Sequence, residues 1–189
     1  MLVFGHTAGA YLITQAPPFS KTKLNCNEMF LVLLAGNIYD TDVVWNFLAG
    51  IPLGAHHLFF GHTPLAGIIY FLIFYFLFRK KVGKPVLAMI ALALFLHLIL
   101  DDLSYIFSLV GLIPQTHPEI FWLFPFDGRR ALILKDYLVN RGNYQFNIID
   151  YMEYYTTTIL PVFLLEIILA VSAVLIFTIK RLDVKNTVD

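Results

Sequence analysis

Seven histidine and aspartate side chains of this chain are candidate metal ligands, and all except His6, which interrupts a short apolar segment, stand at or beside the end of one. Imidazole and carboxylate groups together suit Zn²⁺, Mn²⁺ or Fe. Ionisable groups next to apolar membrane segments are costly, so they usually face a cavity, pair with one another or serve a function. The candidate ligands are His6, Asp40, Asp42, His57, His62, His97 and Asp101.

Two pairs of candidate ligands are close in sequence, and their spacings predict different arrangements. His97 and Asp101 are four residues apart, so on one helix they share a face and can bind the same ion or each other. His57 and His62 are five apart across a loop and a helix start, so either could instead be an ordinary interfacial histidine. Each signal is weak alone, and together they favour a metal site.

Asp40 and Asp42 form an Asp-x-Asp pair after the second apolar segment. They could be a helix cap and a solvated turn residue. In a metal site, Asp42 would be a ligand or the base that takes a proton from an attacking water. The single Cys26 has no partner for a disulfide or a thiolate site, so any metal here must use His and carboxylate ligands.

A metal bound by such groups would do hydrolytic chemistry. Its bound water can ionise near neutral pH and attack an ester or phosphoester, and a second ion about 3.5–4 Å away would steady the leaving oxygen. We expect one or two ions, with zinc as the first choice and manganese or iron as alternatives.

A helical hairpin must position half of these groups. The runs 64–78 and 86–100 are almost wholly apolar, and the basic turn RKKVGK joins them. His62 therefore precedes the first run at the same end where His97 and Asp101 close the second. The remaining ligands must come from two short apolar segments, 2–14 and 28–39, the first of which is ended by the prolines of QAPPF.

The composition is that of an integral membrane protein. The 189 residues are 59% hydrophobic and only 14% charged, whereas soluble domains carry about 25% charged residues. We expect an all-α polytopic bundle of four or five membrane segments, some short, in a single membrane domain over 1–189. Its parts would be a metal-site bundle at 1–113, a polar extramembrane cap at 114–158 with a short helix near 131–139, and a C-terminal transmembrane helix at 159–179. The N-terminal segment lacks the pattern of a removable signal peptide and is expected to stay.

The distribution of basic residues predicts the orientation. Nine of them can be placed on one side, which the positive-inside rule makes cytoplasmic: Lys21, Lys23, Arg79, Lys80, Lys81, Lys84, Lys180, Arg181 and Lys185. The same placement brings the candidate ligands to the opposite, non-cytoplasmic face, although the long 114–158 loop weakens the rule. The formal net charge is zero and no basic block is interleaved with aromatics, so nucleic acid is not an expected partner. The expected partners are membrane lipid and a small-molecule or lipid substrate.

The order of these motifs resembles a known family, the predicted membrane-bound metal-dependent hydrolases, also described as LexA-regulated inner-membrane hydrolases. The resemblance covers roughly residues 1–126 and includes the aromatic-Pro segment WLFPF. It implies a location in the cell inner membrane and a likeness to zinc-dependent phospholipase C. The positions that would match the family's ligands are His6, then Asp40 and Asp42, then His57 and His62, then His97 with Asp101.

The chain departs from the family pattern inside its double-His motif. Leu58 stands where the family commonly has Arg, Gly61 where it has Thr, and Thr63 where it has Ser. Arg129 or Arg130 from the cap could supply the missing guanidinium next to the metal or the substrate.

Two other ionisable residues are candidates for the surroundings of the site. His56 would either support the metal ligands or be merely interfacial. Glu166 could pair with a site histidine or an Arg, or be neutral in a packed core, because a carboxylate inside a span is unlikely to face lipid.

Three functions remain open on the sequence. The first is a membrane-embedded metal-dependent hydrolase acting on a phosphoester or ester, which could be part of a lipid because the site opens where head groups lie. The second is a metal-ion transporter or binding protein that uses the same residues as a transit site, ranked lower because 65–78 and 86–96 hold no ionisable residue except tyrosine. The third is a structural membrane protein whose polar cluster is a hydrogen-bond network without metal.

Overall fold

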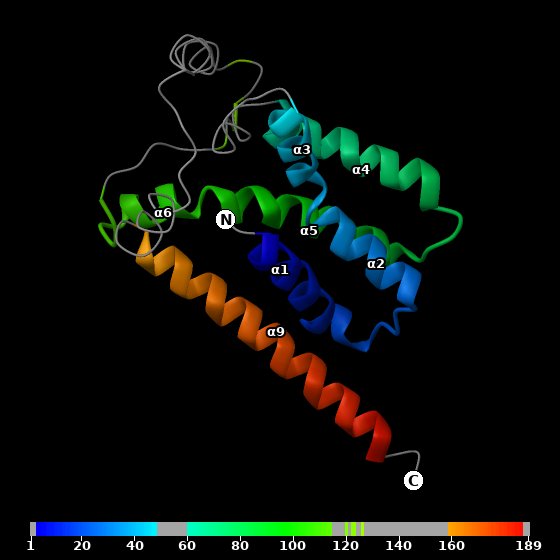
Figure 1. Ribbon diagram of the computed structural model, residues 1–189. Helices are drawn as coiled ribbons and strands as arrows, with labels where there is room; N and C mark the ends of the chain where they lie inside the picture. Colours follow the sequence, from blue (N-terminus) through cyan, green and yellow to red (C-terminus); the bar gives the residue numbers. More distant parts are fainter. Residues whose placement is uncertain are drawn as a thin grey trace.

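The computed structural model describes residues 3–48, 60–114, 120, 122–123, 126 and 159–186, and this part of the chain is helical without strands. The longer helices are shown in Figure 1 and are α1 (Val3–Gln15), α2 (Cys26–Ala35), α3 (Asp42–Leu48), α4 (Pro64–Phe78), α5 (Lys84–Asp101), α6 (Leu103–Leu109) and α9 (Leu160–Asn186). The same described residues include three single turns of 3₁₀ helix, η1 (Phe19–Lys21), η2 (Ile38–Thr41) and η4 (Phe60–His62). The expected all-α class is confirmed.

The predicted hairpin is present as α4 and α5, which pack against each other. Thr63 caps α4, since its hydroxyl accepts a hydrogen bond from Ala66 N at 3.2 Å, and Pro64 takes the first helical position. At the end of the basic turn Gly83 is the N-cap of α5 without a side-chain cap bond, and Pro85 stands in the first turn of the helix. Local signals therefore define where each helix of the hairpin begins, and the turn brings the start of α4 to the same end as the close of α5.

The second apolar segment is shorter as a helix than the sequence predicted. A capping box between Asn25 and Glu28 starts α2, but the helix ends at Ala35 rather than near residue 39. Gly36 is a poor helix former, and the Asn37 side chain donates to the Leu33 carbonyl at 2.7 Å. The chain then turns through η2 into α3, a helix that the sequence analysis did not predict.

Two other boundaries differ from the expectation. The last part of the expected 1–113 bundle is helical only as α6, because Gly111 adopts a positive φ of 75° that ends the turn after it. The C-terminal helix α9 runs beyond residue 179 to Asn186. The cap at 114–158, with its short helix, lies almost wholly outside the described residues.

Helix α5 is central, with α1, α2 and α4 packed around it, and α9 lies on the other side of α1 (Figure 1). Its buried side chains recur every three or four residues and so form one stripe. They are Val86, Met89, Ile90, Ala93, Leu94, His97, Leu98, Leu100 and Asp101. Two candidate ligands thus continue the apolar stripe at its C-terminal end.

Two helices of the described chain, α5 and α9, are long and apolar enough to cross a membrane. Much of the surface of α9 and α4 is apolar and exposed, as at Ile168, Val174 and Phe76. Contiguous apolar surface of this kind marks a membrane or partner contact. Helices α2 and α4 are apolar but shorter.

Candidate metal centre

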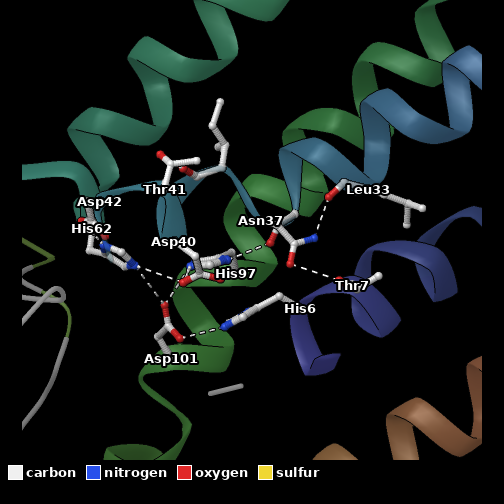
Figure 2. Close-up of polar contacts among 12 residues, drawn as sticks. His6, Thr7, Leu33, Asn37, Asp40, Thr41, Asp42, His62, His97 and Asp101 are labelled. Carbon is white, nitrogen blue, oxygen red and sulfur yellow. Dashed lines mark hydrogen bonds and ion pairs between the residues drawn. The ribbon is translucent and has the colours of Figure 1, made fainter. Parts of the chain in front are cut away.

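Five of the predicted ligands converge from four separate elements (Figure 2). Helix α1 supplies His6, η2 supplies Asp40, η4 supplies His62, and α5 supplies His97 and Asp101. Two groups of three have ligand atoms that lie within 4.8 Å of one another, His6 with Asp40 and His97, and His62 with His97 and Asp101. Such buried His/Asp groups could hold a metal ion.

Asp101 lies at the middle of the cluster. Its Oδ1 is 3.0 Å from Nε2 of His6, and its Oδ2 is 2.9 Å from Nε2 of His97 and 3.8 Å from Nε2 of His62. Asp40 Oδ1 faces the same nitrogens of His62 and His97, at 3.7 Å from each. The side chains of Asp101 and the three histidines are 0% exposed.

The spacings within the group of His62, His97 and Asp101 are close to those around one small cation. Four ligand atoms held tetrahedrally at about 2.0–2.1 Å from zinc lie about 3.3–3.4 Å from each other. The observed nitrogen–oxygen distances, from 2.9 to 3.8 Å, fall on both sides of that value. Moreover, Nε2 of His6 and of His97 is buried and makes no hydrogen bond of acceptable direction within the described structure. These buried donors could therefore hold a metal ion.

The opposite ring nitrogens of two histidines have their own acceptors. His97 Nδ1 lies 2.8 Å from the Gly36 carbonyl oxygen, and His62 Nδ1 lies 2.8 Å from Asp42 Oδ2. A carbonyl cannot donate, so Nδ1 of His97 carries the hydrogen and leaves its Nε2 lone pair directed into the cluster. Metal-binding histidines are usually held in this way by a carbonyl or a carboxylate.

The two aspartates of the Asp-x-Asp pair occupy different positions. Asp40 faces the cluster, whereas Asp42 lies behind the His62 ring and contacts the nitrogen that points away from the cluster (Figure 2). This geometry favours a positioning role for Asp42 over the ligand role that the sequence also allowed. The Asp40 and Asp42 side chains are 13% and 16% exposed, so the cluster is approached from their side.

In the absence of metal, His62 and the carboxylates of Asp40 and Asp42 favour a tightly coupled ion pair. Burial would lower the pKa of His62, but the facing carboxylates of Asp40 and Asp42 outweigh burial and raise it to about 9. Burial would raise the pKa of Asp40, yet His62 and the neighbouring imidazoles bring it below the ordinary value. A metal that binds His62 must displace this proton.

The residues that hold the ligands in place were not among the predicted site residues. Tyr39 is fully buried and stacks on His97, with ring centroids 4.6 Å apart, and His6 stacks on the other face at 3.8 Å. At Gly36 a Cβ would lie 2.6 Å from the Ala10 Cβ, so glycine allows α1 and α2 to approach closely. The only available signal was that Gly36 and Tyr39 stand just before the Asp-x-Asp pair.

Four predicted site residues lie outside the described part of the chain: His56, His57, Arg129 and Arg130. Their roles stay predictions. Glu166 is buried in α9, 5% exposed, and belongs to neither of the two groups of candidate ligands found among the described residues.

Comparisons of the chain with protein-family models, with curated proteins and with solved structures found no match.

Proposed function

We propose that this protein is a membrane-embedded, metal-dependent hydrolase of a phosphoester or ester, with a lipid as the favoured substrate class. The observation that carries the proposal is the convergence of His6, His62 and His97 on Asp101, with His62 and His97 each held through its other nitrogen. That combination of buried donors and supporting acceptors is typical of metal centres. The resemblance to the membrane-bound hydrolases points to the same chemistry.

Each residue of the cluster has a distinct part in the proposed reaction. Three histidines and Asp101 would hold the ion, and zinc would supply an activated water and polarise the ester oxygen. Asp40 lies at the exposed edge beside the histidine nitrogens, where an incoming water would arrive, and would accept its proton. Asp42 would orient the His62 ring from behind.

The membrane placement is part of the proposal. Helices α5 and α9 would cross the bilayer, with α1, α2 and α4 as shorter segments packed beside them. The basic turn between α4 and α5 would face the cytoplasm by the positive-inside rule, so the metal cluster at the other end of the hairpin would open on the non-cytoplasmic side of the inner membrane. Lipid head groups would then be within reach.

The first test is metal content. Purified wild-type protein is expected to contain zinc in a fixed ratio, while His62→Ala and Asp101→Ala lose it. Asp102→Asn is the matched control, because Asp102 is also buried but accepts hydrogen bonds from Ile120 N and Trp122 Nε1. Equal metal in all variants, or none in any, would refute the centre and favour the structural alternative.

The second test separates an enzyme from a transporter. Zinc-loaded protein is offered a panel of phosphoester, ester and phospholipid substrates, and zinc flux is measured in liposomes with the same preparation. Hydrolysis that disappears in Asp101→Ala supports the proposal. Robust flux with no hydrolysis of any substrate would replace it with metal transport.

A further inference from the structure

Two neighbouring cavities lie between α1, α2 and α9, away from the metal cluster. The first, about 290 Å³, is almost entirely apolar and lies along the half of α1 that begins at Phe4. The second, about 410 Å³, lies at the other end of α1 and has a polar rim. Both are lined by Tyr11, Leu33 and Phe177, so they adjoin at one place.

The second cavity has a single cation at its rim. Lys180 Nζ donates to Gln15 Oε1, and Gln15 Nε2 donates to Thr14 Oγ1 at 2.5 Å. Ser20 and Thr22 add two further hydroxyls to the lining. Within the described structure the ammonium of Lys180 contacts this neutral amide and pairs with no carboxylate, so its charge stays available for an anion.

Together the cavities match the polarity of one kind of ligand. A cationic, hydroxyl-rich end accepts a phosphate, and the adjoining space lined by side chains such as Ala173 and Val174 accepts an alkyl chain. Each volume is close to or within the range of about 300–1,000 Å³ that is usual for small-molecule sites. A free phosphate would leave the apolar cavity unused, and a neutral lipid would leave Lys180 unused.

The position of the polar end specifies which lipid is available. Lys180 falls at the C-terminal end of the apolar span of α9, and exposed Lys21 and Lys23 stand on the neighbouring connection. In the proposed orientation this is the cytoplasmic face, where anionic lipids are attracted to clustered lysines.

We propose that the two adjoining cavities together bind one anionic phospholipid of the cytoplasmic leaflet, with its phosphate at Lys180 and an acyl chain in the apolar cavity between α1 and α9. The site is separate from the metal cluster, since none of its lining residues belongs to that cluster. It rests on the proposed membrane placement and not on hydrolysis.

The test is native mass spectrometry of full-length, delipidated protein in detergent, titrated with phosphatidylglycerol or with phosphatidylcholine of the same chains. Wild type is expected to retain one phosphatidylglycerol more tightly than phosphatidylcholine, and inorganic phosphate should not compete. Lys180→Gln should weaken phosphatidylglycerol about fivefold, the effect of removing one lysine near a lipid head group. Ala173→Phe fills the apolar cavity and should abolish retention of both lipids.

Two variants match these changes elsewhere on the surface. Lys80→Gln removes an exposed lysine from the α4–α5 turn, and Ala88→Phe enlarges an exposed alanine of α5. Both should bind lipid as wild type does. The site is overturned if wild type does not prefer phosphatidylglycerol, or if Lys180→Gln behaves like Lys80→Gln. Lys180 is exposed, so this comparison stands even where Ala173→Phe fails to fold.

Zinc content measured on the same samples keeps this inference apart from the proposed function. Lipid loss in Lys180→Gln with zinc retained is the expected result. Selective lipid binding by a protein without zinc would refute the metal centre and leave the lipid site intact.

Discussion

Asp42→Asn is the substitution that best separates the possible roles of the Asp-x-Asp pair. Asp42 Oδ2 accepts a hydrogen bond from His62 Nδ1 at 2.8 Å and contacts no other histidine ring among the described residues. Asparagine has almost the same shape, and its amide oxygen can still accept from the ring. The change therefore removes the negative charge behind His62 while it leaves the packing in place.

The expected loss of zinc affinity is modest. Removing the partner behind a metal-binding histidine typically weakens metal binding about 10–100-fold, or about 1.4–2.7 kcal/mol. A direct ligand would cost more and would reduce the amount of bound metal as well. If Asp42 only positions His62, Asp42→Asn should still bind zinc in the wild-type ratio, with the affinity lowered by that factor.

Competition with a chromophoric zinc chelator measures this affinity in detergent solution. Asp101→Ala is the reference for a lost ligand, and Asp102→Asn is the control for a buried aspartate next to the cluster. An Asp42→Asn protein with unchanged affinity would refute the positioning role. A protein that loses zinc as completely as Asp101→Ala would make Asp42 a ligand.

Three further predictions concern stability and pH. Gly36→Ala places a Cβ 2.6 Å from the Ala10 Cβ and should lower the free energy of unfolding by about 1–3 kcal/mol, whereas Gly83→Ala, with only Pro85 Cδ at 3.5 Å, should be nearly neutral in the same denaturation assay. Met89→Ala removes a fully buried side chain from α5 and should cost about 2–5 kcal/mol, against a much smaller loss for the exposed Leu92→Ala; equal losses would contradict the assigned inner face. Because the pKa of His62 is raised from 6.5 to about 9, its stabilisation of the metal-free protein is full below about pH 6.5 and is lost as pH rises through about 9. Zinc requires the neutral ring of His62, so its affinity should increase over the same rise in pH. The thermal unfolding temperatures measured with and without zinc should therefore diverge as pH rises. Parallel plots of the two temperatures against pH would refute the linkage.

Much of the helical framework was predictable because its signals are local. Thr63 with Pro64 and Gly83 with Pro85 start α4 and α5 where the sequence predicted. The end of α2 was not predictable from hydrophobicity, because the apolar run continues past Ala35 to Tyr39 while Gly36 and Asn37 end the helix. The long described helix α9 was predicted, with only its C-terminal end misjudged.

The amino-acid sequence by itself determined the kinds of ligand and one of their pairings. With a single cysteine, only imidazole and carboxylate donors were available, and the four-residue spacing of His97 and Asp101 placed them on one face of one helix. The apolar hairpin with its basic turn also determined that His62 would stand at the same end as this pair.

Only the tertiary structure decided which other residues join them. His6 and Asp40 reach Asp101 and His97 from segments far away in the sequence, through the close approach of α1 and α2 at Gly36. The two-residue spacing of Asp40 and Asp42 could not reveal that one faces the cluster and the other the back of His62, because that depends on the turn from η2 into α3. Contacts between distant segments depend on how helices pack, and no local pattern of residues encodes that packing by itself.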